Sequence, residues 1–433
     1  MNNRVIKNAT WIIACKIVQS IIAIALSAIT ARYLGPANFG VINYAASIVS
    51  FVVPIMYLGL NAILVHELID NSIEDEGKIL GTAITLSAIS ALLCILGVFS
   101  FVYFVNCGEN VVILVTALYS FLLLFQAFDL IQFWFQANLL SKYTSLVTLV
   151  AYLLVSIYRV IILASGKNVL WFAVTQPIDY LIIAVLLLIV YKKRGGQKLV
   201  FDFSVAKRLL SKSRYYIISG LMVNIYAQTD RIMLKLLIDD TSIGYYSAAI
   251  TCVGYSSFVF NAIIDSYRPT ILENYKKSKS IFEQRLMSLY SVVIFLSLAQ
   301  SVLMTLLSKP IIMLMFGSSY LPSVGILQIV VWYSMFSYIG GAKDIWILAE
   351  GKQRYLLLLN ISGVIINIVM NVILIPTYGP YGAAIATLCT QLFANVIISF
   401  AIPQLRHNSV LILRSFYPKA LLSQLRELRR KEK

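Results

Sequence analysis

Charged residues are scarce in this sequence: they make up 12% of its 433 residues, whereas 60% are apolar. Soluble proteins of this size carry about 25% charged residues, so the composition excludes one or two water-soluble domains. The apolar residues stand in long runs, such as Ile79–Val105 and Leu146–Ala164, and a helix needs about 20 such residues to cross a bilayer. Strands of a membrane barrel would instead alternate over about ten residues. We therefore expect an all-α polytopic membrane protein.

Histidine and cysteine are also rare, with two and five residues. The cysteines are neither paired as C-x-x-C nor spaced like metal ligands, and four of them lie within apolar runs, where cysteine behaves as a small hydrophobic residue. We therefore expect no metal site and no cofactor. The sequence also lacks a phosphate-binding P-loop, which excludes ATP as the energy source, and it lacks a catalytic constellation, so we do not expect an enzyme.

The first apolar stretch, residues 10–31, is of spanning length and has no small-residue cleavage site after a short core. We interpret it as a membrane helix and not as a signal peptide. At about 20 residues a span, the length allows about twelve helices, and Gly, Pro, Asn and charged residues mark the breaks. The expected spans are residues 10–31, 41–64, 79–105, 111–138, 143–164, 169–191, 215–238, 244–266, 286–308, 323–349, 355–375 and 380–403.

The positive charges are distributed unevenly between the two sides of these spans. If the N-terminus is cytoplasmic, the outer loops hold only Arg32, Lys167 and Lys309, and nearly all other loop cations face inward. Cytoplasmic loops carry the excess of Lys and Arg in membrane proteins, so we predict that both termini are cytoplasmic. The net charge of +16 then reflects orientation, and we expect no nucleic-acid partner.

Two pairs of segments echo each other along the chain. Trp134–Tyr143 and Trp346–Tyr355 share Trp, Ala and Tyr in register, and residues 39–46 resemble residues 243–249. The echoes predict two pseudo-symmetric six-helix lobes, related by an axis along the membrane normal, that rock around a central cavity.

Four regions follow from this duplication. The expected lobes are residues 1–191 and 215–403, joined by a basic cytoplasmic linker, 192–214, and followed by a basic cytoplasmic tail, 404–433. The tail mixes apolar and basic residues from position 409 onward. It is either an amphipathic helix on the inner leaflet or a solvated segment.

Polar residues within the spans are the candidate site. A charge at the bilayer centre costs roughly 2.5–3.5 kcal/mol on insertion scales and usually faces a cavity or a partner. Asn224, Gln228, Arg231 and Lys235 follow helical spacing and form one polar stripe. Arg231 is the deepest of them, and we predict that it contacts an anionic substrate group, because guanidinium donors suit phosphate oxygens.

Other spans contribute polar residues to the same predicted cavity. Asn43 and Asn61 lie on one stripe in the second span, Lys16 lies in the first, and Arg159 lies in the fifth. Two simpler interpretations stay open. Lys16 and Lys235 lie near helix ends and could extend to the membrane surface, and Arg159 could have a structural hydrogen-bonding role.

Two carboxylates are candidates for ion coupling. Asp129 lies deep in the fourth span with Gln126, Phe133 and Gln136 on its face, and Asp265 shares a face with Ser247 in the eighth span. A carboxylate inside the membrane can carry a proton when burial favours its neutral form. The alternative for Asp129 is a buried side chain satisfied by Gln or Tyr donors.

Four motifs resemble those of a known family. They are Arg32–Gly40, Thr229–Leu234 followed by Ile243–Ala249, Trp346–Gly351, and Asn367–Asn371 with Ile375–Ala384. The sequence resembles the bacterial polysaccharide-repeat flippases of the multidrug, oligosaccharidyl-lipid and polysaccharide exporter superfamily, and is most similar to the O-antigen flippase branch. It departs from that pattern at Lys235, where relatives often carry a small residue.

The resemblance implies two lobes around a V-shaped cavity in a bacterial plasma (inner) membrane. It implies transport of an undecaprenyl-diphosphate-linked oligosaccharide, an O-antigen or capsule repeat unit, driven by an ion gradient. The expected partners are this lipid-linked oligosaccharide, membrane lipids and other glycan-assembly membrane proteins. Peptidoglycan-precursor flippases of the same superfamily usually have fourteen spans, which argues against that assignment.

Two other functions remain as alternatives. A multidrug or cation antiporter of the same superfamily would need acidic, aromatic pockets, whereas the stripes here are basic. A membrane glycosyltransferase or polymerase would need large outer loops with catalytic residues, whereas the longest predicted outer loop is only 308–322.

Overall fold

A computed structural model of the chain describes residues 3–417, and these residues form helices and connections without any β-strand. The chain divides into two compact units, one ending at Gln228 and one beginning at Thr229. The helices of the first unit are α1 (Asn3–Met56), η1 (Leu60–Ala62), α2 (Leu64–Asp70), η2 (Ile73–Asp75), α3 (Glu76–Val105), α4 (Asn110–Ser120), α5 (Leu122–Gln126), η3 (Ala127–Leu130), α6 (Ile131–Ala137), α7 (Ser141–Ala164), α8 (Val169–Ala173) and α9 (Thr175–Lys193).

Helix α10 (Phe203–Leu237) contains the boundary between the two units. The helices of the second unit are α11 (Asp240–Lys277), α12 (Lys279–Leu306), α13 (Ser308–Met315), η4 (Ser318–Tyr320), α14 (Ser323–Ala349), α15 (Arg354–Tyr378), α16 (Pro380–Leu392), the π-helix η5 (Phe393–Ile397), α17 (Ile398–Ala401) and α18 (Pro403–Arg414).

Ten helices within residues 3–417 are long and apolar enough to cross a membrane, so the chain is a multi-pass membrane protein. The first two predicted spans are merged in α1, where the expected loop at 32–40 is helical apart from a kink at Gly35 (φ 71°). The seventh predicted span lies in α10, whose polar residues lower its hydropathy. The total of twelve spans stays a prediction.

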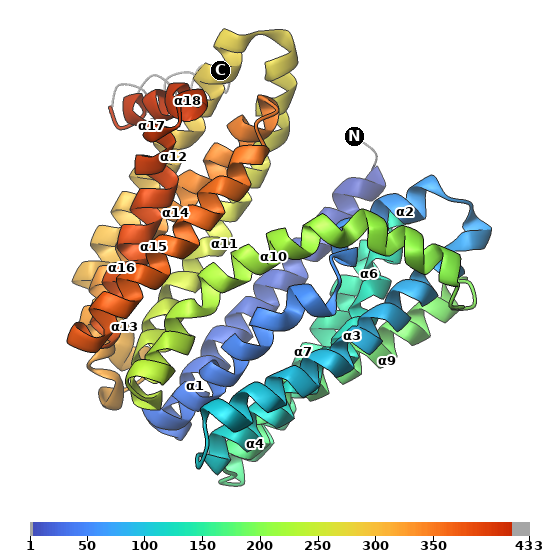
Figure 1. Cartoon of the computed structure of the whole chain (residues 1–433), viewed down its shortest axis with the longest axis horizontal. Helices are drawn as coiled ribbons and strands as arrows, with labels where there is room; N and C mark the ends of the chain where they lie inside the picture. Colours follow the sequence, from blue (N-terminus) through green and yellow to red (C-terminus); the bar gives the residue numbers. More distant parts are fainter. Residues whose placement is uncertain (1–2, 418–433) are drawn as a thin grey trace. The chain divides into compact units, whose positions relative to one another are not determined.

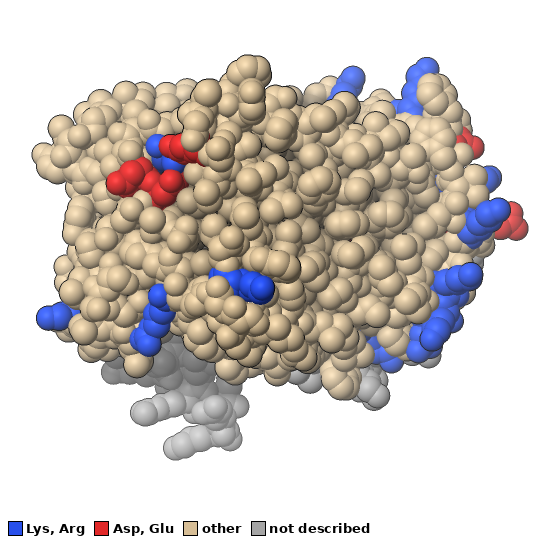
Figure 2. Space-filling model, turned by 90° about the horizontal axis from the view of Figure 1, so that it is seen from below, with Lys and Arg blue, Asp and Glu red and all other residues tan. Residues whose placement is uncertain are grey.

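The long helices of the first unit pack side by side (Figure 1). Helix α1 packs against α3, α4 and α7, and α7 packs against α9. Large apolar side chains point outward from this bundle, among them Leu93 and Phe104, which are 65% and 77% exposed. Most of the surface shown in Figure 2 likewise consists of uncharged residues. Such a surface is expected where lipid chains, and not water, surround the protein.

The segment after α9, which is the expected basic linker at 192–214, runs along α3 and then enters α10. Its backbone lies on α3, where Gly77 and Gly81 leave room: a Cβ at Gly77 would be 2.4 Å from the Lys198 carbonyl oxygen. The Val200 N–H donates to the Gly77 carbonyl oxygen over 3.2 Å, and the Asp202 N–H donates to Thr82 Oγ1 over 2.9 Å. The linker is therefore anchored to the first unit.

Helix α10 begins at Phe203, twelve residues before the predicted seventh span. Asp202 caps its first turn, since its Oδ1 accepts from the backbone N–H groups of Ser204 and Val205 over 2.8 and 3.1 Å. Hydrogen bonds from the Ser204 hydroxyl and from these N–H groups lower the pKa of the Asp202 carboxyl. The cap explains why the basic residues of the expected linker continue as a helix.

Two of those basic residues bind a buried carboxylate. Glu67 of α2 is 4% exposed, and its carboxylate lies 3.4 Å from Arg208 Nε and 2.5 Å from Lys212 Nζ. A buried carboxylate needs such partners, since an isolated charge is costly away from water. This pairing fixes the first turns of α10 against α2.

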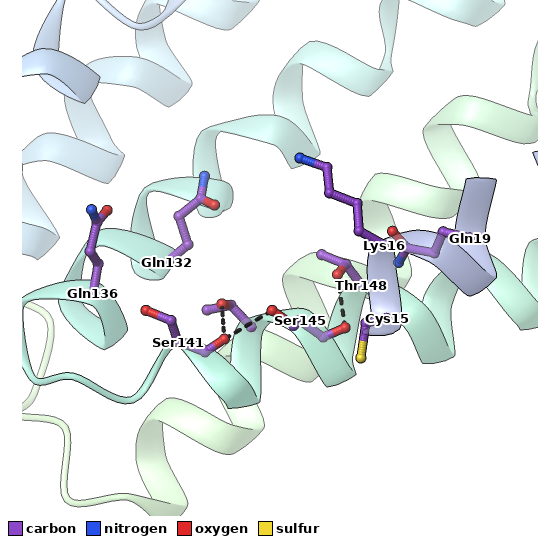
Figure 3. Close-up of a pocket in the computed structure, with 9 residues that line it drawn as sticks. Cys15, Lys16, Gln19, Gln132, Gln136, Ser141, Ser145 and Thr148 are labelled. Atoms are coloured by element: carbon purple, nitrogen blue, oxygen red, sulfur yellow. Dashed lines mark hydrogen bonds between the residues drawn. The ribbon is translucent and has the colours of Figure 1, made fainter. Parts of the chain in front are cut away.

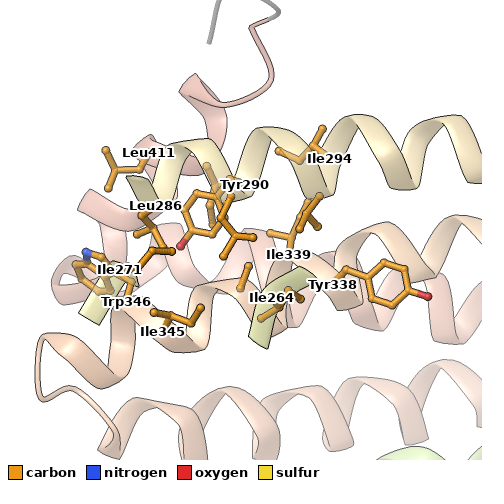
Figure 4. Close-up of a cluster of buried hydrophobic side chains, with 14 of the residues drawn as sticks. Ile264, Ile271, Leu286, Tyr290, Ile294, Tyr338, Ile339, Ile345, Trp346 and Leu411 are labelled. Carbon is orange, nitrogen blue, oxygen red and sulfur yellow. The ribbon is translucent and has the colours of Figure 1, made fainter. Parts of the chain in front are cut away.

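The core of the second unit lies between α11, α12, α14 and α18 (Figure 4). It includes Tyr290, Ile339, Trp346 and Leu411, and the Tyr290 hydroxyl donates to Asn408 Oδ1 over 2.8 Å. Because α18 contributes buried side chains, the first part of the predicted tail belongs to the folded unit. The rest of that tail, from residue 418, lies outside the described residues.

Candidate functional site

The polar stripe of α10 contains two cations with different surroundings. Arg231 is half-buried, and its Nε donates to Ser247 Oγ of α11 over 3.1 Å. Lys235 is buried, and its Nζ lies 2.7 Å from Asp240 Oδ2 at the start of α11. Lys235 therefore has an ion-pair partner at the start of α11, and Arg231 is hydrogen-bonded to a hydroxyl of the same helix.

The two amides of the stripe lie one turn apart, nearer the start of the same helix. Asn224 is half-buried and donates to the Gly220 carbonyl oxygen of its own helix over 3.1 Å. Gln228 is half-buried and is the last residue of the first unit. The predicted spacing places all four stripe residues along α10, which is continuous between them.

Asp230 is a buried carboxylate with four side-chain hydrogen-bond partners, and the sequence did not predict these partners. It is 6% exposed. Its Oδ1 accepts from the amide nitrogens of Asn367 and Asn371 on α15, over 3.0 and 2.6 Å. Its Oδ2 accepts from the Tyr246 hydroxyl over 2.5 Å and from the Thr387 hydroxyl.

This cluster brings together oxygen atoms from four helices, α10, α11, α15 and α16. Asn371 Oδ1 is buried without a hydrogen-bond partner within residues 3–417. Carboxylate, hydroxyl and amide oxygens are the ligands preferred by hard cations, and a carboxylate can also take up a proton. Both amides turn their N–H donors to Asp230, so the oxygens that a proton or a small cation could use here are those of the carboxylate, the two hydroxyl groups and Asn371 Oδ1.

The first unit places its predicted cations in separate cavities. Lys16 lines a polar cavity between α1, α6 and α7 (Figure 3). Arg159 lines another of about 120 Å³, together with Tyr119, Thr175 and Gln176. The two residues therefore do not share one site within this unit.

The two asparagines predicted for the second span lie in different settings. Asn43 is half-buried on α1 and donates to the Phe39 carbonyl oxygen over 2.8 Å. Asn61 is exposed in the short helix η1. Asn61 therefore lies outside the long helix that carries Asn43, because α1 ends at Met56.

The two predicted coupling carboxylates also differ in environment. Asp129 lies in η3 near Asp179, Tyr57 and Tyr180, and Gln126 Nε2 donates to the Tyr180 hydroxyl over 3.4 Å. Asp265 has a side chain 68% exposed, 3.4 Å from Arg268 NH2. Of the two, Asp129 has the enclosed, aromatic surroundings.

The described residues also hold no group of three or more His, Cys, Asp or Glu side chains that could bind a metal ion. Asp179 adds a second carboxylate near Asp129, and its Oδ1 is buried without a hydrogen-bond partner in this part of the chain. A sequence signal for it existed, since Asp179 is a charge within a predicted span.

This fold is shared with membrane transporters of known structure. Lipid II flippase MurJ in an inward closed conformation has a TM-score of 0.70 and 16% identity, with 95% of this chain and 89% of that chain covered. An inward-facing multidrug resistance MATE family transporter of the MOP superfamily has a TM-score of 0.67 and 12% identity, with 92% and 96% covered. At these identities the likeness concerns the fold.

Sequence comparison gives the family. Residues 5–275 match the polysaccharide biosynthesis protein family, and the chain belongs to that family. An uncharacterised membrane protein of Methanocaldococcus jannaschii is 25% identical over 229 residues, which are 50% of this chain and 45% of that protein. The chain thus matches somewhat less than half the length of this curated relative.

Proposed function

We propose that this protein flips an anionic lipid-linked oligosaccharide from the inner to the outer leaflet of a bacterial plasma membrane. The cargo in this proposal is an O-antigen or capsule repeat unit on undecaprenyl diphosphate. Membership of the polysaccharide biosynthesis protein family and a fold shared with lipid II flippase MurJ support it. The charge distribution, with Lys and Arg concentrated on one predicted side, supports cytoplasmic termini.

The observation that carries the proposal is Arg231 on α10. Arg231 is half-buried, and its helix, α10, contains the boundary between the two compact units. Its Nε lies 3.1 Å from Ser247 Oγ. A guanidinium has five N–H donors in a planar arrangement that suits two phosphate oxygens at once. The Ser247 hydroxyl holds the Nε side of this guanidinium against α11.

An ion gradient is the energy source in this proposal, with Asp230 as the first candidate for the coupling carboxylate and Asp129 as the second. Asp230 is a buried carboxylate that accepts hydrogen bonds from four side chains of the second unit, and it is the sequence neighbour of Arg231. Occupation of Asp230 by a cation would change the charge beside Arg231, and so couple the ion to the anionic substrate.

The proposal is tested by deleting the gene in its host. Surface glycan should be lost, and the lipid-linked repeat unit should accumulate in the membrane, as measured by glycan electrophoresis and by mass spectrometry of extracted lipids. A plasmid-borne copy should restore both. Normal surface glycan in the deletion strain, with no accumulated precursor, would contradict the proposed function.

One observation favours a second candidate, a multidrug or cation antiporter. Asp129 and Asp179 lie near each other with Tyr57 and Tyr180 close by, and acidic, aromatic surroundings suit cationic drugs. Expression in a strain without its own efflux pumps distinguishes the two functions. A flippase should leave ethidium resistance unchanged, whereas an antiporter should raise it in a manner that Asp129→Asn removes.

A further inference from the structure

The cavity between α1, α6 and α7 is lined by hydrogen-bonding groups and holds no carboxylate. Its volume is about 340 Å³, within the range of about 300–1,000 Å³ that is usual for ligand pockets. Three glutamines from two helices, four hydroxyl groups from α7 and the Lys16 ammonium surround it, with the Cys15 thiol beside them (Figure 3). Its lining residues are Cys15, Lys16, Gln19, Gln132, Gln136, Ser141, Thr144, Ser145 and Thr148.

The hydroxyl groups of α7 are oriented by their own helix. Thr144 and Ser145 donate to the Ser141 carbonyl oxygen over 2.7 and 3.1 Å, and Thr148 donates to the Ser145 carbonyl oxygen over 3.1 Å. Each of these three hydroxyl hydrogens is therefore engaged, and each oxygen retains lone pairs that can accept a bond from a ligand.

The donors of the cavity come from the other side chains. Within the described part of the chain, the side chains of Gln19, Gln132, Gln136 and Lys16 make no hydrogen bond or ion pair with another residue. An amide offers two N–H donors and one acceptor oxygen, and an ammonium offers three donors. The cavity thus presents donors and acceptors together, and one positive charge.

We propose that this cavity is the glycan-binding subsite of the flippase, holding a sugar of the oligosaccharide on its hydroxyl groups, with Lys16 on an anionic group of the substrate. Sugar hydroxyls both donate and accept, so they match a mixed wall of amides and hydroxyls. A cationic or apolar ligand finds neither a carboxylate nor an aromatic ring among the nine lining residues. The inference rests on the proposed function and adds a second contact region to that of Arg231.

The position of the cavity agrees with this role. Gln136 stands at the end of α6 and Ser141 at the start of α7, a break that the charge distribution predicts to be cytoplasmic. The glycan of a lipid-linked precursor is on that side before transport. The anionic group on Lys16 could come from an acidic sugar or from the diphosphate, and the experiment separates these sources.

The test measures ligand-induced thermal stabilisation of the purified full-length protein. The probes are the oligosaccharide released from the host's surface polysaccharide, the same oligosaccharide after reduction of its carboxyl groups, and inorganic diphosphate. The double variant Gln132→Ala/Gln136→Ala should bind the oligosaccharide about tenfold more weakly, whereas diphosphate binding should be unchanged. The matched control, Gln176→Ala, changes a glutamine of the Arg159 cavity and should bind both probes normally.

Lys16→Gln identifies the source of the anionic group. Weaker binding of the native oligosaccharide, but not of its reduced form, assigns an acidic sugar to Lys16, and weaker binding of diphosphate assigns the diphosphate. Gln132→Glu, which keeps the side-chain size, should also weaken oligosaccharide binding and guards against an effect of lost volume.

The outcomes separate this inference from the proposed function. If the double variant binds the oligosaccharide as tightly as the wild-type protein does, the subsite is wrong, and the proposed flippase function is unaffected. Absence of oligosaccharide binding by the wild-type protein would likewise overturn the subsite. If the proposed flippase function is wrong, the deletion strain will show unchanged surface glycan and no accumulated precursor.

Discussion

The indole nitrogen of Trp134 donates a hydrogen bond of 2.6 Å to the carboxylate of Glu76, and both side chains are buried. Trp134 begins one of the two echoing segments, and its counterpart in the second unit is Trp346. The Trp346 indole nitrogen is buried without a hydrogen-bond partner among residues 3–417. The two tryptophans thus occupy matching positions in the echoing segments, but only the N–H group of Trp134 has a hydrogen-bond partner in the described region.

This difference predicts different costs for the same substitution. Trp134→Phe removes the donor to a buried carboxylate and should lower the free energy of unfolding by about 1–3 kcal/mol. Trp346→Phe makes the same change in ring size but removes an N–H that has no hydrogen-bond partner in the described region, so its cost should be smaller. Thermal unfolding in detergent measures both. Equal losses of melting temperature in the two variants would contradict the role of the Glu76 bond.

Arg231 is predicted to bind the substrate diphosphate. Arg231→Ala should abolish glycan export while the protein stays in the membrane at its normal level, and Arg231→Lys should keep partial activity, because a point charge still attracts phosphate. Surface glycan and membrane-protein abundance are measured together. Loss of the protein itself in Arg231→Ala would indicate a structural role for Arg231. Normal export at normal protein abundance would contradict both the substrate-binding role and the structural role.

Asp230 is predicted to hold the coupling ion. Asp230→Asn removes the charge that four side chains face, so transport should fall at least tenfold and lose its dependence on the ion gradient. Asp239→Asn is the control, because Asp239 is exposed and caps α11 through the Ser242 N–H. Transport by proteoliposomes with and without a gradient measures the effect. Wild-type gradient dependence in Asp230→Asn would exclude this carboxylate, and Asp129→Asn would then be examined in the same way.

The linker is predicted to depend on glycines of α3. A Cβ at Gly81 would be 2.5 Å from the Val200 backbone nitrogen, so Gly81→Val should displace the linker and speed trypsin cleavage after Lys198. Gly97→Val is the control on the same helix, since a Cβ at Gly97 meets no atom within 4 Å. Cleavage is followed by mass spectrometry. Equal cleavage rates in the two variants would show that the linker does not rely on this close approach.

The orientation of the chain is tested at two connections. Cys107 is exposed between α3 and α4, on the predicted outer side, and Gly195 follows α9 on the predicted inner side. A membrane-impermeant maleimide should label Cys107 in intact cells, and it should label a cysteine at Gly195 only after the membrane is opened. The Gly195→Cys change is made together with Cys107→Ser, and labelling of that double variant in intact cells would contradict the predicted topology.

The sequence predicted those features of the fold and the site that are determined by residues close together on one helix. Long apolar runs identified membrane helices, and helical spacing indicated that Asp230 and Arg231 point apart. Asp230 accepts from Asn371 on α15 and from Tyr246 on α11, whereas Arg231 donates to Ser247 on α11. Periodicity describes one helix at a time. It could not indicate that Asn371, 141 residues from Asp230, would complete a cluster around it.

Backbone conformation was the other limit of the sequence. Gly35-Pro36 and the polar residues around it predicted a loop, but the chain needs only one residue with positive φ to turn, and the helix resumes at once. The basic residues of 203–214 predicted a solvated linker, because their partner, the buried Glu67, lies 145 residues before Lys212. A charge run indicates exposure only when no distant carboxylate meets it.

The continuity of α10 has a consequence for how such a protein could be encoded. A duplicated transporter can in principle be divided into two half-length genes. A break at Gly195 would leave the buried Glu67 carboxylate in one polypeptide and its two cations, Arg208 and Lys212, in the other. A break after Leu237 would instead separate Asp230 from the four side chains that donate to it. Either split would leave a buried carboxylate in one fragment and its partners in the other, so co-expressed fragments should assemble poorly, and a single reading frame is the arrangement that this helix favours.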